Sequence, residues 1–261
     1  MDSSEPHLHV PHFFTSLTKD VNKLLPRRAV LIAPDGSQVQ PSTTTFKHVL
    51  TEVETQASWK GLPADLPKPK DDGACDHLKD TMLQSVSLAS TAGNSVDPST
   101  LSGLSILFCY PRTGAPDEEV PDEWNQIPGA RGCTPQACSF RDAAKDFLAQ
   151  GVNHIFGVST QDTAYQREVK ERVHLPYQLL SDEHLLLTRS LELPTFDWKG
   201  KQLIKRLTLA VEDGKIVNVW YPVFPPDRSA AEVLEWLEKR TGRENLSTNK
   251  EDELMRNLQH R

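Results

Sequence analysis

Two of the four cysteines in this 261-residue chain lie five positions apart, in the segment GCTPQACSFRD. A thiolate can act as a nucleophile, a metal ligand or a disulfide partner. Pro135 is typical of a first helical turn, which places Cys133 at a helix N-terminus. That end of a helix carries about half a positive charge and free N–H groups, and both stabilise a thiolate. Because the cation Arg131 is also near, Cys133 is predicted to be a reactive thiol.

The position of Cys138 limits what the two thiols can do together. On an intact helix, five residues give about 7.5 Å of rise and about 140° of rotation, so the Cα atoms are about 8.6 Å apart. A disulfide needs a Cα separation below about 7 Å. A Cys133–Cys138 bond therefore requires the helix start to unwind. Otherwise both thiols are buried helical residues without a chemical role. A metal site is less favoured because no second cysteine or histidine pair has a matching spacing.

The surrounding pattern indicates the elements that position these cysteines. The sequence predicts a strand pair in SVSLASTAGNSVD, a buried strand in LSGLSILFCYP, a helix in TPQACSFRDAAKDFLAQG, a strand in VNHIFGVST, a helix in QDTAYQREVKERVH, a short element and a helical turn in PYQLLSDEHLLLTRSL, a hairpin in LIKRLTLAVEDGKIVNVWYP and a closing helix in RSAAEVLEWLEKRTG. This order predicts an α/β fold with a central mixed sheet and helices on both faces. A cysteine pair just after the first buried strand is typical of a thioredoxin-like fold.

The remaining sequence predicts the domain organisation and the cellular context. Residues 1–70 are expected to be a partly helical extension with a short strand in RRAVLIAPDGSQV, residues 71–242 the thioredoxin-like domain, and residues 243–261 a mobile charged tail. A net charge of −7 argues against a nucleic-acid partner. No apolar run reaches the roughly 18 residues of a membrane span, and the N-terminus lacks the features of a signal peptide. A cytoplasmic protein is therefore predicted.

The segment GCTPQACSFRD resembles the active site of the peroxiredoxins, specifically the bacterioferritin-comigratory (PrxQ) branch, whose pattern is close to G-C-T-x-x-A-C-x-F-R-D. The likeness continues in FGVSTQDTAYQREVKERVHLPYQLLSD and KRLTLAVEDGKI, and it covers roughly residues 78–240. The resemblance implies that Cys133 attacks a peroxide and becomes a sulfenic acid, and that Cys138 then forms a disulfide with it. It also implies a thioredoxin or glutaredoxin-type reductant, a monomer or homodimer, and no metal or other cofactor.

Arg206 matches the family arginine that contacts the thiolate and the peroxide. The strand pattern KRLTLAV supports this match, because Leu207 and Leu209 share one face while Arg206 and Thr208 share the other. A cation on an inner strand needs a partner, and a thiolate is one. The alternative is an exposed arginine at the end of a strand.

The loop before Cys133 departs from the family pattern P-x-x-x-(T/S)-x-x-C. Ala130 stands where the family has a hydroxyl. A long acidic insertion, RTGAPDEEVPDEWNQIPGARG (residues 112–132), follows Pro111 and is expected to be a loop. Two outcomes are therefore open: turnover is slow, or Thr113 folds back and supplies the hydroxyl, with Pro128 shielding the pocket.

Arg131 and Thr134 complete the candidate pocket residues. Where the branch often has an acid, this chain has Gln136, and the loss of a nearby negative charge favours a thiolate. Trp124 is expected to anchor the insertion.

Three functions fit these observations. The first is a thiol peroxidase that reduces hydrogen peroxide or organic hydroperoxides. The second is a peroxiredoxin-like enzyme with another substrate, such as a thiol–disulfide oxidoreductase or a tailoring enzyme for a small metabolite. The third is a redox-regulated binding or chaperone module. Outside the pair, Cys109 is expected in the core and Cys75 as an exposed thiol. The histidines of HLHVPH (His7, His9, His12) have a loose, metal-like spacing.

Overall fold

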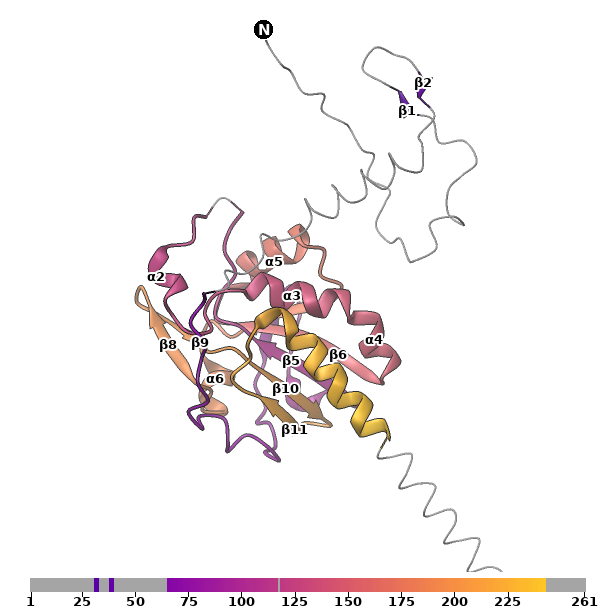
Figure 1. Cartoon of the computed structure of the whole chain (residues 1–261). Coiled ribbons are helices and arrows are strands. Elements are labelled where there is room, and N and C mark those ends of the chain that lie inside the picture. The colour runs from indigo at the N-terminus through magenta and orange to yellow at the C-terminus, as the bar shows by residue number, and fades with distance from the viewer. Residues whose placement is uncertain (1–30, 33–37, 40–64, 117, 243–261) are drawn as a thin grey trace, which may run out of the picture. The chain divides into compact units, whose positions relative to one another are not determined.

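The structure is a computed structural model that describes residues 31–32, 38–39, 65–116 and 118–242 (Figure 1). The chain divides into two units, residues 1–61 and 62–261. In the first unit, β1 (Leu31–Ile32) pairs antiparallel with β2 (Gln38–Val39), which confirms the strand predicted there. The helical part expected before residue 70, the HLHVPH histidines and the tail lie outside the described residues. The predicted boundary near residue 70 stays a prediction.

The second unit is built on a mixed sheet of seven strands in the order β11-β10-β5-β6-β7-β3-β4. These are β3 (Leu88–Ser90), β4 (Ser95–Val96), β5 (Leu104–Cys109), β6 (Val152–Ser159), β7 (Gln178–Ser181), β10 (Leu207–Glu212) and β11 (Lys215–Trp220). β5 runs parallel to β6 and antiparallel to β10, with Cys109 opposite Leu207. Every residue of β5 is buried, as expected for a central strand covered on both faces. The predicted mixed sheet is confirmed.

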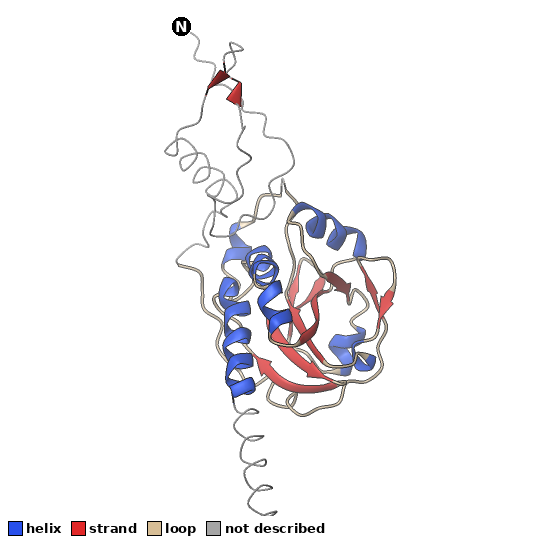
Figure 2. Ribbon diagram, turned by 90° about the vertical axis from the view of Figure 1, so that its right-hand side faces the viewer, coloured by secondary structure: helices blue, strands red, loops and turns tan. Residues whose placement is uncertain are grey.

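Helices pack on both faces of this sheet (Figure 2). The helical elements are the 3₁₀ turns η2 (Pro98–Thr100) and η3 (Pro226–Arg228), the helices α3 (Cys133–Asp142), α4 (Ala144–Ala149), α5 (Thr163–Arg172) and α6 (Leu186–Ser190), and a closing helix that is described over residues 229–242. The single helix predicted after Cys133 is divided in two, because Ala143 between α3 and α4 has φ −90° and ψ 0°. Among the described residues, no helix is long and apolar enough to cross a membrane.

The side chains on the two faces of β5 belong to two separate apolar clusters. Ile106 and Phe108 pack with α3, α4, α5 and the closing helix, whereas Leu107 and Cys109 pack with α6 and the segment before β3. The ring of Phe108 stacks on Phe140 of α3, with centroids 4.4 Å apart. A Cβ at Gly157 of β6 would lie 2.7 Å from that ring, so glycine is required there. This packing fixes α3, and Cys133 with it, over the centre of the sheet.

Several elements of this unit were not predicted, among them a hairpin and a short helix. The hairpin β8 (Thr195–Trp198) and β9 (Lys201–Ile204) forms a separate two-stranded sheet, and α2 (Asp122–Asn125) lies inside the insertion that was expected to be a loop. Trp124 of α2 packs against Phe196 and Trp198 of β8, with ring centroids 6.0 and 5.1 Å apart. The expected role of Trp124 as the anchor of the insertion is therefore confirmed. The insertion is held on the β8–β9 hairpin, beside the start of α3.

Candidate active site

Cys133 is the first residue of α3, so its predicted place at a helix N-terminus is confirmed. Gly132 before it is in the left-handed region with φ 102°, a conformation that glycine adopts without steric cost. The side chain of Cys133 is only 4% exposed, and its Sγ donates to the carbonyl of Ala130 at 3.5 Å. A sulfur in this position faces the positive end of the helix and is nearly excluded from water.

Arg206, the residue directly before β10, contacts the sulfur of Cys133. Its Nη2 donates to Sγ of Cys133 at 3.1 Å and to the carbonyls of Ala130 and Arg131 at 3.1 and 3.3 Å. Its Nε donates to the carbonyl of Gly129 at 3.2 Å. The arginine is 3% exposed, which excludes the alternative of an exposed residue at a strand end. The contribution of Arg131 to this cluster is its carbonyl oxygen.

The guanidinium of Arg206 has no charged partner in the described part of the chain. No carboxylate there forms an ion pair with it. Its acceptors are backbone carbonyls, the amide oxygen of Gln136 and the sulfur of Cys133. A buried cation is costly unless a negative charge lies close to it. A thiolate at Cys133 would supply that charge.

Gln136, one turn into α3, also holds the guanidinium of Arg206 in place. Its Oε1 accepts from Nη1 of Arg206, and its Nε2 donates to Oγ of Ser229 at 3.3 Å. The hydroxyl of Ser229 is also 3.2 Å from that of Thr208 in β10. The start of the closing helix therefore supports the arginine through an uncharged network. Sequence reasoning noted Gln136 as a departure from the family pattern but missed Ser229, because no pattern links residues so far apart in the chain.

Cys138 lies in α3 together with Cys133, and neither cysteine is in a disulfide. Its side chain is 6% exposed. Near it, the hydroxyl of Tyr177 donates to the carbonyl of Ala137 at 2.6 Å, which ties this turn of α3 to the segment before β7. The helix α3 is thus intact between the two cysteines.

A cavity of about 440 Å³ opens beside this site. Arg206 lines it together with Pro128, the predicted shielding residue, and with Pro111, Gly129 and Phe196. Since Arg206 also contacts the sulfur of Cys133, a molecule in the cavity would reach the group that holds the sulfur. The insertion and the β8–β9 hairpin thus form part of the cavity wall.

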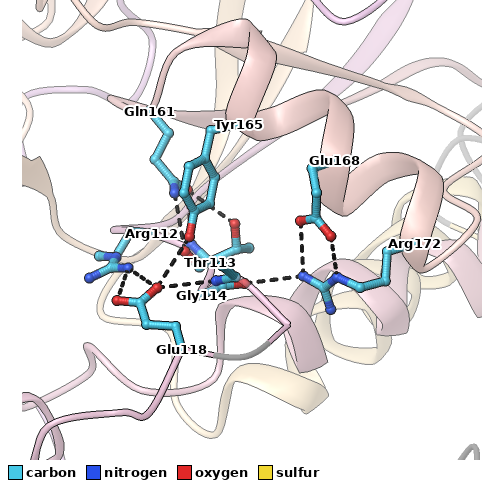
Figure 3. Close-up of polar contacts among 9 residues, drawn as sticks. Arg112, Thr113, Gly114, Glu118, Gln161, Tyr165, Glu168 and Arg172 are labelled. Carbon is cyan, nitrogen blue, oxygen red and sulfur yellow. Dashed lines mark hydrogen bonds and ion pairs between the residues drawn. The ribbon is translucent and has the colours of Figure 1, made fainter.

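The structure places Thr113 against Gln161, in the loop between β6 and α5 (Figure 3). Its N–H donates to Oε1 of Gln161 at 2.9 Å, its hydroxyl lies 3.2 Å from the same oxygen, and its carbonyl accepts from Nε2 of Gln161 at 3.1 Å. No hydrogen bond joins Thr113 to Cys133 among the described residues. Thr134 is 7% exposed in the first turn of α3, directly after Cys133. A role of Thr113 or Thr134 in the peroxide pocket stays a prediction.

The base of the insertion is fastened to α5 by the contacts drawn in Figure 3. Arg112 forms an ion pair with Glu118, and the hydroxyl of Tyr165 donates to Glu118 at 3.2 Å. Further along α5, Arg172 donates to the carbonyl of Gly114 at 3.1 Å. Both ends of the insertion are therefore fixed, one on α5 and the other at the start of α3.

The two cysteines outside α3 lie in the opposite apolar cluster. Cys109 is fully buried, which confirms its expected core position, and burial raises the pKa of its thiol. The expectation of an exposed Cys75 is wrong, because this residue is only 5% exposed and packs among the apolar side chains of the same cluster. Burial, and then the charge of Asp72, raises the pKa of Cys75 to about 12. The acidic residues around Cys75 made its segment look like surface, but the cysteine itself turns inward.

Comparison with known proteins agrees with this architecture and site. Residues 78–234 match the family model described as Redoxin. The chain is 26% identical over 203 residues to a chloroplastic peroxiredoxin Q of Oryza sativa subsp. japonica, covering 76% of this chain and 84% of that protein. It is 29% identical over 133 residues to a putative peroxiredoxin bcp of Coxiella burnetii, covering 49% and 77%.

A solved structure is similar as well. The crystal structure of the peroxidoxin BcpB from Mycobacterium tuberculosis superposes with a TM-score of 0.51 at 26% identity, covering 62% of this chain and 96% of that one. The predicted thioredoxin-like fold is thereby confirmed, and so is the resemblance to the peroxiredoxin Q branch. Because the family match spans more than half of the sequence and contains Cys133, Cys138 and Arg206, the chain belongs to the redoxin family.

Proposed function

We propose that this protein is a thiol peroxidase in which Cys133 is the nucleophile. The observation that carries the proposal is the buried guanidinium of Arg206, 3.1 Å from the sulfur and without a carboxylate partner among the described residues. Such a cation stabilises both a thiolate and the negative charge that develops when a peroxide bond breaks. The relatives named as peroxiredoxins support the same activity.

In the first step, the thiolate of Cys133 attacks the terminal oxygen of a hydroperoxide. An S–O bond forms and the O–O bond breaks. The sulfur is oxidised to a sulfenic acid, and the peroxide oxygen leaves as an alkoxide or hydroxide that takes up a proton. Arg206 and the free N–H groups at the start of α3 face the reacting oxygens, which is where donors lower the barrier.

In the second step, the thiolate of Cys138 attacks the sulfenic sulfur of Cys133. An S–S bond forms, and hydroxide leaves and is protonated to water. Since both residues lie in α3, this step needs the first turns of that helix to unwind. A dithiol reductant of the thioredoxin or glutaredoxin type then reopens the disulfide by exchange and is itself oxidised.

The missing family hydroxyl at Ala130 affects the rate of the first step. The donors that remain are Arg206 and the backbone N–H groups of the loop and helix start. Removal of one donor of this kind ordinarily lowers a rate by about 10²-fold. Either the enzyme is slow, or Thr113 leaves Gln161 and supplies the hydroxyl. In the second case Thr113→Val slows Cys133 oxidation by at least about tenfold, whereas Thr134→Val has a smaller effect.

A steady-state assay of the purified protein tests the proposal. Hydrogen peroxide and cumene hydroperoxide are offered with a thioredoxin system, a glutaredoxin system or dithiothreitol, and NADPH or thiol consumption is followed. We expect peroxide-dependent turnover that Cys133→Ser abolishes. If Cys133 reacts with peroxides no faster than a free thiol of equal ionisation, the peroxidase proposal is wrong. The cavity beside Arg206 would then favour a small-metabolite substrate.

The cytoplasmic location and the monomeric or homodimeric state also stay proposals. Relatives from plants are named as chloroplastic.

A further inference from the structure

The segment 66–72, which we call the strap, contributes Lys68, Pro69 and Lys70 to the wall of the cavity beside Arg206. Asp72 fixes one end of it, because its carboxylate accepts from Nζ of Lys205 at 2.9 Å and from the hydroxyl of Tyr221 at 2.8 Å. Both of these partners line the cavity. In the middle of the strap, Pro69 lies against Gly129, where an added Cβ would be 3.4 Å from the proline ring.

The carboxylate of Asp72, which binds Lys205 and Tyr221, stays charged across the physiological pH range. Hydrogen bonds from Lys205 and then from Tyr221 lower the pKa of Asp72 to about 2.

The strap contributes two lysines to the cavity wall, and every charged side chain in that wall is positive. Lys68 and Lys70 line the cavity together with Lys205 and Arg206, and no acidic side chain is part of the lining. Asp72 offsets the charge of Lys205, and Arg206 faces the sulfur of Cys133. Lys68 and Lys70 are exposed, and within the described residues neither forms an ion pair. Their charges are available to a ligand.

The rest of the cavity wall is apolar. Ile127 and Pro128 come from the insertion, Phe196 from β8, and Pro111 and Pro222 from loops at the ends of strands. One water molecule needs only roughly 10–15 Å³ of such cavity space, so a volume of about 440 Å³ is much larger than hydrogen peroxide requires. The cavity therefore fits an organic body, with Arg206 available to a hydroperoxide and Lys68 and Lys70 available to a negative group.

A second cavity of about 500 Å³ lies between α5 and the β8–β9 hairpin, and the charges in its wall differ from those of the first. Its wall combines Arg112 and Lys199 with Asp162 and Glu183, so it offers both signs of charge. The single-signed wall beside Arg206 is thus a property of that cavity and not of the whole surface, whose net charge is negative.

We propose that the preferred substrates are organic hydroperoxides that carry a carboxylate, which Lys68 and Lys70 of the strap recognise. This inference rests on the proposed peroxidase function and adds the substrate class to it. The reaction remains the one given above, in which the hydroperoxide is reduced to an alcohol while Cys133 is oxidised; the carboxylate takes no part in bond making.

The test compares three matched probes in the full-length protein: cumene hydroperoxide, its para-carboxylate and the methyl ester of that carboxylate. The second-order rate of Cys133 oxidation is measured for each by stopped-flow fluorescence, with hydrogen peroxide as the reference. We expect the carboxylate to react about fivefold faster than its ester at low salt, which is the scale of one or two exposed ion pairs. The preference should fall as ionic strength rises, because salt screens exposed charges.

The variant Lys68→Gln/Lys70→Gln should lose this preference while its rate with hydrogen peroxide stays within about twofold of the wild type. Lys79→Gln/Lys145→Gln is the control, since both lysines are exposed and neither lines the cavity. Equal rates for carboxylate and ester, or a preference that survives in the Lys68/Lys70 variant, would overturn the inference and leave the peroxidase function standing. A wild-type protein that none of the four peroxides oxidises would overturn both.

Discussion

Cys133 and Cys109 are both nearly excluded from water, at 4% and 0% exposure, yet their surroundings differ in every respect that matters for chemistry. Cys109 lies on the face of β5 that packs against α6, and burial raises the pKa of its thiol. Cys133 lies against the other face, at a helix N-terminus, with Arg206 3.1 Å from its sulfur. Burial by itself suppresses the thiolate, whereas burial with a cation and free N–H groups creates a place for one.

The largest expected effect is that of removing the reactive sulfur. Cys133→Ser should lower peroxidase activity by at least about 10³-fold, because a serine hydroxyl is hardly ionised at neutral pH. The steady-state assay with hydrogen peroxide measures it. Cys109→Ala is the matched control on the opposite face of the sheet and should retain at least half of the wild-type activity. More than a tenth of the activity in Cys133→Ser would remove the distinction between the two cysteines.

The next largest effect concerns the cation that distinguishes the two sites. Arg206→Ala should reduce the second-order rate of Cys133 oxidation by about 10²-fold, the usual cost of losing one donor to a developing negative charge. Arg206→Lys should recover part of this loss, because it keeps the charge but not the forked donors. Stopped-flow oxidation and thiolate absorbance at 240 nm at neutral pH are the two readouts. An unchanged rate in Arg206→Ala would mean that the arginine only supports the fold.

The smallest expected effect is a pH dependence of the free energy of unfolding, which arises from the buried thiol of Cys75. The pKa of Cys75 is raised from 9.0 to about 12, so between these pH values the unfolded chain loses a proton that the folded chain keeps. The free energy of unfolding should therefore fall with rising pH, by about 1.4 kcal/mol per pH unit from this thiol. Below pH 9 the contribution is constant.

Urea denaturation of the wild type and of Cys75→Ala between pH 8 and pH 10.5 isolates this contribution, because all other titrating groups are shared. The wild type should lose stability more steeply above pH 9. Parallel curves for the two proteins would show that Cys75 ionises as easily in the folded state as in the unfolded one.

The parts of the site that are local in sequence could be predicted from the sequence. The helix start at Cys133, the buried strand β5 and the two faces of KRLTLAV each follow from a short pattern of residue types. The mixed sheet could be anticipated because predicted strands alternate with predicted helices and one hairpin turns at Asp213–Gly214.

The parts that depend on contacts between distant residues could not be predicted. Ser229 supports Gln136 across 93 positions, and Lys205 and Tyr221 hold Asp72 across 133 and 149. The β8–β9 hairpin has only four residues in each strand, and it is stabilised by the Trp124 cluster of the insertion. The burial of Cys75 could not be predicted because several of its neighbours in the sequence are acidic. The composition of a short segment indicates that the segment is at the surface, but it does not show which single side chain points inward.

The most direct measurement of the role of Cys133 is to trap the sulfenic acid itself. Reduced Cys138→Ser is treated with one equivalent of hydrogen peroxide in the presence of dimedone, and peptide mass spectrometry locates the adduct among the three remaining cysteines. We predict near-complete labelling of Cys133, no label on Cys75 or Cys109, and, in the untrapped wild type, a Cys133–Cys138 disulfide within one chain. Labelling of Cys75 or Cys109 in place of Cys133, or an unlabelled Cys133 in a protein that still consumes peroxide, would contradict the assignment.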